Sequence, residues 1–183
     1  MIFLLLLCIS DMFVTYLTDC ICTTVPCPIQ GHNTVIMGEG GANITYIYNL
    51  HETNEVVVSA YGTVTPESLD KGTETTSCTQ KYSRMLEDDG NQDCDAGHIL
   101  ANRLGGYGNL PINIFPQDAS TNRGSYAQFE GNIYDCMKNG STVGHLSWTF
   151  DYESASNTMP KSVKYTAEFE NGDCRSLCSH FPN

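Results

Sequence analysis

The sequence predicts an α+β domain in which a mostly antiparallel mixed sheet is combined with one long helix. Four segments are rich in β-branched and aromatic residues, as strands are. Between the second and the third of them lies a stretch with apolar residues at intervals of three and four, the period of an amphipathic helix. The chain has 183 residues, which is close to the size of a single domain.

The first two segments, 43–50 and 55–64, are predicted to form a hairpin with its turn near Thr53-Asn54. The second segment is rich in β-branched residues, which favour extended backbone. In the first segment every second residue is apolar, so one face of the strand would be buried. These alternating residues are Ile44, Tyr46, Tyr48 and Leu50.

The middle of the chain is predicted to be mostly irregular. The segment 65–95 is polar and is expected to be loop, with an exposed acidic part at 87–95. A short strand is expected at 97–103. Glycines and a proline in 105–111 then interrupt any regular element, and 114–120 is also expected to stay irregular.

Residues 121–138 are predicted to be the helix, which ends at Asn139-Gly140 because glycine often follows a last turn. Asn122 lies where the helix should start, so helix capping is one possible role for it. Two further strands, at 142–152 and 162–170, would complete the sheet. The apolar residues of the helix are interpreted as core rather than as a base-stacking face: Tyr126, Phe129, Ile133 and Met137.

Residues 1–22 are predicted to be a secretory signal peptide with an open cleavage point, which leaves 23–183 as the domain. We expect no membrane segment after the signal is removed. The chain has nine cysteines, and loss of Cys8 would leave an even number, which predicts disulfides in a secreted, extracellular protein. A zinc site is the less favoured alternative for one cluster, made of Cys174, Cys178 and His180.

The chain is strongly acidic, with a formal net charge of −12. Loss of Asp11 and Asp19 with the signal peptide would still leave a charge of −10. Such a surface repels a phosphate backbone at long range, which argues against tight nucleic-acid binding. Any activity on nucleic acid must therefore depend on a locally favourable site.

One segment, 95–106, reads DAGHILANRLGG and places His98 after an Asp-x-Gly step. A neutral imidazole can take a proton from water near neutral pH. Downstream, Asn122 and Glu130 supply hard oxygen atoms of the kind that suits Mg²⁺. Eight helical residues rotate these two by about 80° and separate them by roughly 12 Å, so they could share one side of the helix. A base and a hard cation are what metal-assisted hydrolysis of a phosphodiester requires.

At these residues the sequence resembles the DNA/RNA non-specific endonucleases of the ββα-metal (His-Me finger) superfamily, particularly their secreted and toxin-domain branch. The similarity covers about residues 80–172, and its main motifs keep their order over 36 residues. The shared residues are Asp95, Gly97, His98, Gly105, Gly106, Asn113, Pro116, Gln117, Asn122, Arg123, Gly124, Tyr126 and Glu130.

The resemblance implies a ββα-metal core, in which a β-hairpin and a helix hold one Mg²⁺ or Mn²⁺ ion. It implies His98 as the general base, Asn122 as the direct metal ligand and Glu130 as the group that holds metal-bound water. Asn113 would help to place His98 or the phosphate. The implied activity is hydrolysis of DNA and RNA, contacted at phosphate without sequence specificity, to products with a 5′-phosphate.

Two departures from the family pattern stand out. Many members carry arginine where this chain has Ala96, so the cation that steadies the pentacovalent phosphorus must come from elsewhere. Three arginines are candidates, Arg84, Arg103 and Arg123, and Arg123 is included among the expected catalytic residues. The second departure is the acidic stretch just before His98, which is expected to raise the pKa of that residue if it lies near.

Two other functions stay open. The chain could be a secreted, cysteine-rich binding module that keeps the nuclease scaffold and has lost catalysis, which Ala96 and the negative charge favour. A hydrolase that uses serine and histidine is less well supported, because the sequence contains no Gly-x-Ser-x-Gly motif. A cleavage assay with and without a metal chelator separates the nuclease from the binding module.

Overall fold

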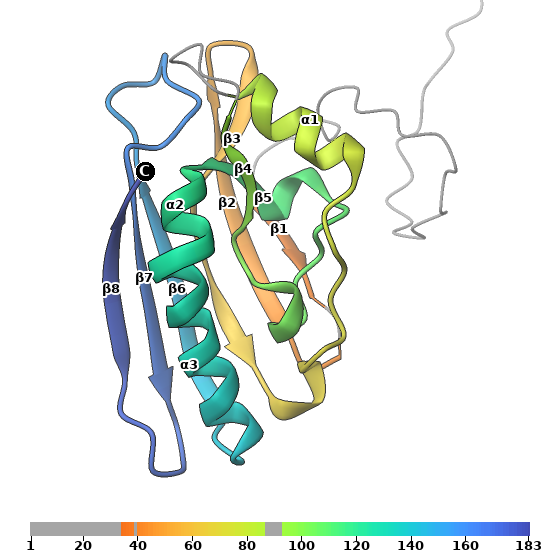
Figure 1. Ribbon diagram of the computed structural model, residues 1–183, viewed down its shortest axis with the longest axis vertical. Helices are drawn as coiled ribbons and strands as arrows, with labels where there is room; N and C mark the ends of the chain where they lie inside the picture. The colour runs from red at the N-terminus through yellow and green to blue at the C-terminus, as the bar shows by residue number, and fades with distance from the viewer. Residues whose placement is uncertain (1–33, 39, 87–92) are drawn as a thin grey trace, which may run out of the picture.

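The computed structural model describes residues 34–38, 40–86 and 93–183, and the predicted signal peptide lies outside them. Its largest element is a six-stranded antiparallel sheet in the order β1-β2-β3-β6-β7-β8 (Figure 1). A separate ladder pairs β4 (Asp95–His98) with β5 (Ile114–Gln117). The predicted α+β class is confirmed. The strands of the large sheet are β1 (Thr34–Met37), β2 (Asn43–His51), β3 (Asn54–Val64), β6 (Val143–Asp151), β7 (Ser162–Phe169) and β8 (Leu177–Pro182).

The hairpin predicted at 43–64 is present, with β2 and β3 paired up to a tight turn. Glu52 in this turn has a φ of 53°, the left-handed conformation that tight hairpin turns require. Leu50 departs from the expected alternation, because it is 63% exposed while its neighbour His51 is buried. Leu50 lies opposite Glu55, one pair before the end of the strand, while the register shift between Ile47 and Tyr48 places its extra residue, Val58, on β3. The earlier alternating residues are buried as predicted: Ile44, Tyr46 and Tyr48.

The helix predicted at 121–138 starts earlier and is less regular than expected. It begins as α2 (Ala119–Thr121), passes through a π-helical turn (Asn122–Tyr126) and continues as α3 (Ala127–Lys138). Asp118 rather than Asn122 caps the start, since its carboxylate accepts a 2.7 Å hydrogen bond from the backbone N–H of Thr121. The end is as predicted, with Gly140 following the last turn at a φ of 92°.

The long helix lies across one face of the large sheet (Figure 1). Aromatic rings join the two layers, with the ring centre of Phe129 at 4.8 Å from that of Tyr165 on β7 and 5.6 Å from that of Phe181 on β8. Each such pair contributes about 1 kcal/mol beyond its buried area. The helix is therefore firmly placed on the sheet. Its predicted core residues are buried: Tyr126, Phe129, Ile133 and Met137.

The prediction of a loop throughout 65–95 is wrong, because this segment contains helix α1 (Ser77–Met85). Few residues of α1 are apolar, so hydrophobic periodicity does not reveal it. Its start is fixed instead by a capping box, in which the side chains of Thr76 and Thr79 each accept a hydrogen bond from the backbone N–H of the other residue. The acidic part at 87–92 lies outside the described residues.

Two expectations for the short ladder also need correction. The strand expected at 97–103 is β4, which ends at His98. The segment 114–120 is not wholly irregular, because its first four residues form β5. Pro116 hid this strand, since proline lacks the N–H that a ladder uses. Within the described ranges β5 pairs with β4 alone, and such an edge position tolerates proline.

The cysteines show one complete disulfide in the described part of the chain. Cys136 at the end of α3 is bonded to Cys174 just before β8, which confirms a disulfide-stabilised fold. Cys178 is exposed and not in a disulfide, so the expectation of pairing fails for this residue. The zinc alternative for Cys174, Cys178 and His180 has no support, because no group of three metal-ligating side chains occurs among the described residues. No helix within the described ranges is long and apolar enough to cross a membrane.

Candidate active site

The short ladder and the long helix form a strand-strand-helix unit in chain order. β4 runs antiparallel to β5, with His98 opposite Ile114. A loop with two short 3-10 helices, Asn102–Leu104 and Pro111–Asn113, connects the strands. The chain enters the helix directly after β5. This is the order of elements that the resemblance to ββα-metal nucleases implies.

The imidazole of His98 is held by the main chain of a neighbouring loop. Its Nε2 lies 3.2 Å from the carbonyl oxygen of Thr73. Because a carbonyl can only accept a hydrogen bond, Nε2 carries the proton in the neutral ring. Nδ1 therefore has an open lone pair and is the nitrogen that can take a proton from another group.

Burial lowers the pKa of His98 below its ordinary value. The contact with Thr73 and the negative charge of Glu74 act in the opposite direction but do not outweigh it. The acidic part at 87–92, which is expected to raise this pKa if it lies near, is outside the described residues, and within them the carboxylate that acts on the ring is Glu74. The imidazole is neutral at neutral pH, as a general base must be.

The loop that holds His98 is anchored to the segment between β4 and β5. The backbone N–H of Thr73 donates to the carbonyl of Gly106, and that of Gly108 donates to the carbonyl of Thr73, both at 2.9 Å. The hydroxyl of Thr73 also donates to Asn109 at 2.8 Å. A Cβ at Gly108 would lie 2.4 Å from Nε2 of His98, so a side chain does not fit. Sequence reasoning missed Thr73 and Gly108, because neither residue type indicates such a contact.

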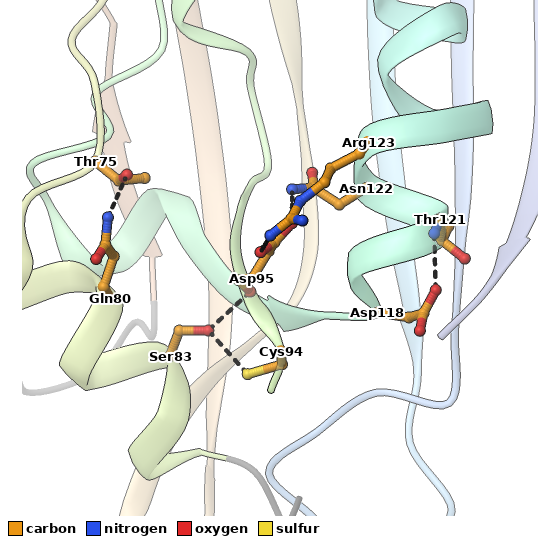
Figure 2. Close-up of polar contacts among 9 residues, drawn as sticks. All are labelled: Thr75, Gln80, Ser83, Cys94, Asp95, Asp118, Thr121, Asn122 and Arg123. Carbon is orange, nitrogen blue, oxygen red and sulfur yellow. Dashed lines mark hydrogen bonds and ion pairs between the residues drawn. The ribbon is translucent and has the colours of Figure 1, made fainter. Parts of the chain in front are cut away.

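Asp95 joins β4 to the long helix (Figure 2). Its carboxylate accepts a 2.9 Å hydrogen bond from Nδ2 of Asn122 and two bonds from Arg123, from Nε at 2.8 Å and from Nη2 at 2.6 Å. Burial opposes the ionisation of Asp95, but these partners outweigh it and lower its pKa. The carboxylate is therefore charged at neutral pH and keeps both partners in place.

The contact with Asp95 fixes the orientation of the Asn122 amide. A carboxylate can only accept, so Nδ2 must face Asp95 and Oδ1 turns away from it, as Figure 2 shows. Among the described residues Oδ1 has no hydrogen-bond partner. An amide oxygen presented in this way can serve as a ligand for a hard cation.

Glu130 lies eight residues further along the helix. The residue is partly exposed, but its Oε1 is fully buried and has no hydrogen-bond partner among the described residues. Burial raises the pKa of Glu130 to about 8, against the opposing effect of the positive charge of Arg103. The carboxyl group is thus mostly protonated at neutral pH unless a further positive charge approaches. The charge of Glu130 also acts on Tyr126 and Tyr165, which are both buried in the core.

The π-helical turn changes how Asn122 and Glu130 face each other. In a regular α-helix the eight residues between them rotate by about 80° beyond two full turns. A π turn closes its hydrogen bonds over five residues instead of four, so each residue rotates less. The turn spans Asn122–Tyr126 and is kinked at Gly124, whose φ of −107° and ψ of −105° are not helical, so the regular α-helical angle between the two side chains does not apply.

Asn113 is fully buried, and its side chain is fully occupied by the protein. Oδ1 accepts hydrogen bonds from the hydroxyl of Tyr46 and the N–H of Leu100, both at 2.8 Å. Nδ2 donates to the carbonyls of Leu100 at 2.9 Å and Tyr107 at 3.3 Å. These bonds fix the chain just after His98. Of the two roles implied for Asn113, its contacts favour placing His98 over binding the phosphate.

The candidate arginines lie in two places. Arg123 is paired with Asp95, and Arg84 on α1 acts on the same carboxylate electrostatically. Arg103 lies elsewhere, with its guanidinium carbon 5.7 Å from the ring centre of Tyr134 on α3. Ala96 pairs with a residue of β5 and brings no charge to the site.

A divalent cation fits the donor set of this site. In the described part of the chain no hydrogen bond joins His98, Asn122 and Glu130 directly. The amide oxygen of Asn122 is the atom that could hold such a cation, with water completing its coordination. Mg²⁺ binds few protein groups and keeps several waters, so a sparse oxygen set suits it.

Known proteins resemble this chain in sequence. The sequence model of the DNA/RNA non-specific endonuclease family matches residues 36–171. The probable deoxyribonuclease RhsA of Dickeya dadantii (strain 3937) is 38% identical over 122 residues, which make up 67% of this chain and 8% of that protein. The chain thus corresponds to a small part of a much longer relative.

The fold also resembles that of NucA from Streptococcus agalactiae. The TM-score is 0.60 for NucA with a magnesium ion bound and 0.53 for NucA with no metal bound. Both comparisons cover 78% of this chain, 70% and 71% of NucA respectively, at 14% identity, so they show a shared fold. The family match covers more than half of the chain and includes every candidate site residue from Asp95 to Glu130. The chain belongs to the DNA/RNA non-specific endonuclease family.

Proposed function

We propose that this protein hydrolyses phosphodiester bonds in DNA and RNA without sequence specificity, with Mg²⁺ or Mn²⁺ as cofactor and His98 as general base. The observation that carries the proposal is the orientation of a neutral imidazole, with Nε2 held by Thr73 and Nδ1 without a hydrogen-bond partner among the described residues. The relative named as a probable deoxyribonuclease supports DNA as a substrate. RNA as a substrate is supported by the description of the family.

In this proposal Nδ1 of His98 takes a proton from water as the water oxygen attacks phosphorus in line. The 3′ oxygen leaves, and the product keeps a 5′-phosphate. A divalent cation, when bound, neutralises charge on the phosphate and on the leaving oxygen. Asn122 would hold this cation through Oδ1. The negative charge of ionised Glu130 would favour binding of the cation.

The other predicted site residues act on the geometry of these groups. Asn113 holds the chain that follows His98. Arg123 pairs with Asp95, and Asp95 in turn orients the amide of Asn122. Contacts to phosphate alone would account for activity without sequence specificity, because phosphates carry no sequence information.

We further propose that the protein is exported and works outside the cell. The disulfide between Cys136 and Cys174 supports this, because disulfides persist in oxidising compartments. The signal peptide expected at 1–22 lies outside the described residues. N-terminal sequencing of the protein recovered from culture medium tests both parts of the proposal.

A plasmid-nicking assay tests the activity. The wild-type protein should convert supercoiled DNA to nicked and linear forms with Mg²⁺ and should fail with EDTA. His98→Ala should lower the rate by at least about 100-fold, the usual contribution of a general base. His145→Ala is the matched control, because His145 is an exposed histidine on β6, and its rate should stay at the wild-type level.

The alternative is a binding module that has lost catalysis. Under that alternative the wild-type protein would retard DNA in a gel but would not cleave it at any Mg²⁺ or Mn²⁺ concentration. Cleavage by the wild type that His98→Ala leaves undiminished would contradict the proposed base.

A further inference from the structure

A cavity of about 600 Å³ lies beside the loop that holds His98. Its lining includes Gly72 and Glu74, the two neighbours of Thr73, whose carbonyl binds the imidazole. The opposite wall is formed by α3 and the short helix after β4. The full lining is Asp70, Gly72, Glu74, Asn102, Arg103 and Tyr134. The cavity therefore connects the surroundings of His98 with the helix that carries Glu130.

The carboxylates of this cavity already have partners. Asp70 accepts a 2.8 Å hydrogen bond from the hydroxyl of Tyr134. Glu74 accepts a 2.5 Å hydrogen bond from Nδ2 of Asn102. These bonds hold the walls in place. The guanidinium of Arg103 also belongs to the lining. It forms no hydrogen bond and no ion pair among the described residues.

Arg103 lies close to α3, the helix that carries Glu130. Its Nη1 lies 3.8 Å from the position that a Cβ on Gly131 would occupy, one residue after Glu130. Its charge acts on Glu130 and stabilises the ionised carboxylate. Arg103 also lies against the ring of Tyr134, which restricts its position.

Two further cations lie beside this cavity, whose lining also carries the carboxylates of Asp70 and Glu74. Lys138 lies against the same Tyr134 ring as Arg103, with its Nζ 5.8 Å from the ring centre. Lys71 is exposed between two residues of the cavity wall. These are three of the nine lysines and arginines in a chain with a net charge of −12. The lining itself carries one cation, Arg103, beside the hydrogen-bonded carboxylates of Asp70 and Glu74.

We propose that Arg103 binds the phosphate being cleaved and supplies the positive charge that Ala96 does not. The inference rests on the proposed nuclease function. Arg123 is less suited to the role because Asp95 holds its guanidinium in an ion pair, and Arg84 is less suited because it does not line this cavity. The guanidinium of Arg103 acts on Glu130 electrostatically but forms no ion pair among the described residues, so its donors can form two parallel hydrogen bonds to phosphate oxygens. It would be most effective when negative charge builds up on those oxygens in the transition state.

Single-turnover cleavage of an end-labelled DNA duplex tests this role, with protein in excess over DNA. The rate constant at saturating protein reports the reaction, and the protein concentration at half-saturation reports binding. Arg103→Ala should lower the saturating rate constant by about 100-fold, as removal of one group that stabilises the transition state does. Arg103→Lys should recover part of the loss, because lysine keeps the charge but lacks the paired donors.

Lys138→Ala is the matched control, because it removes the other cation from the same ring without changing the lining of the cavity. Its saturating rate constant should stay within about twofold of the wild type. Thermal unfolding of each variant checks that the fold is kept, which is expected for exposed side chains. An Arg103→Ala variant with the wild-type saturating rate constant, or with a change in half-saturation alone, overturns the inference. Absence of cleavage by the wild type contradicts the proposed function as well.

Discussion

Asn122 and Asp95 are joined by a 2.9 Å hydrogen bond in which the amide donates to a carboxylate that Arg123 also holds. The bond connects the first strand of the site with the start of the helix. It directs the amide oxygen of Asn122 away from the strand (Figure 2). Loss of the carboxylate would leave the amide free to turn. The affinity of the amide oxygen for a cation would then fall.

The first prediction concerns this carboxylate. Asp95→Ala should raise the Mg²⁺ concentration at half-maximal cleavage by about tenfold, because residues that orient a metal ligand typically contribute that much to metal affinity. A titration of the cleavage rate with Mg²⁺ measures it. Asp151→Ala is the control, since it breaks a 3.2 Å surface ion pair with Lys161. An unchanged Mg²⁺ dependence in Asp95→Ala would show that the contact does not orient a ligand.

The second prediction concerns the pH dependence of cleavage. The base must be neutral, and burial lowers the pKa of His98, so kcat/KM should fall with decreasing pH only below the ordinary histidine value of 6.5. Glu74 raises this pKa, so Glu74→Gln should move the acid limb to still lower pH. A shift of the limb to higher pH in Glu74→Gln would contradict the assignment. Profiles of kcat/KM between pH 4 and 8 at constant ionic strength measure the acid limb in the wild type and in Glu74→Gln.

The third prediction concerns the stability of the metal-free protein. The folded-state pKa of Glu130, about 8, lies above its ordinary value of 4.5, so the folded state binds more protons than the unfolded state between these values. Stability should therefore fall as pH rises through this window, by up to about 1.4 kcal/mol per pH unit. Glu130→Gln cannot ionise and should reduce this slope. Urea unfolding in EDTA at several pH values tests it, and equal slopes in both proteins would refute it.

The fourth prediction concerns the glycine beside His98. A Cβ at Gly108 would lie 2.4 Å from Nε2 of His98 and 2.5 Å from the carbonyl oxygen of Thr73. Gly108→Ala should therefore displace the imidazole and lower kcat by about 10-fold or more. Gly131→Ala is the matched control, because its Cβ would meet a single atom at an ordinary distance of 3.8 Å. That variant should keep its rate and gain about 1 kcal/mol of stability from the helix.

The fifth prediction concerns the disulfide between Cys136 and Cys174, which closes a segment of 38 residues. Cys136→Ser should lower the free energy of unfolding by about 3–4 kcal/mol, from the entropy regained by the unfolded chain. Cys178→Ser removes an exposed thiol that is not in a disulfide and should change little. Chemical denaturation without reductant compares the two, and equal stabilities would argue against a stabilising bridge.

Hydrophobic periodicity predicted the parts of the fold that bury one face. The hairpin at 43–64, the helix at 121–138 and the last pair of predicted strands are present with nearly the expected bounds. Hydrophobic periodicity did not predict α1, because a capping box and not an apolar stripe defines that helix. It failed for β5, because a proline in a four-residue strand looks like a loop.

The sequence pointed to candidate side chains but not to the main-chain groups that hold them. His98, Asn122 and Glu130 were proposed from residue types, their spacing and the family resemblance, and their roles stay predictions. The carbonyl of Thr73 could not be predicted, because every residue has one. The choice among the arginines was also out of reach, since it depends on which of them meets Asp95 in space.

The group that holds the imidazole of His98 belongs to the backbone, and this has an evolutionary consequence. Substitution at position 73 changes the side chain but leaves the carbonyl where it is, so this support survives most point mutations. Insertions or deletions in the loop would move the carbonyl. Selection should therefore preserve the length of this loop more strictly than its composition.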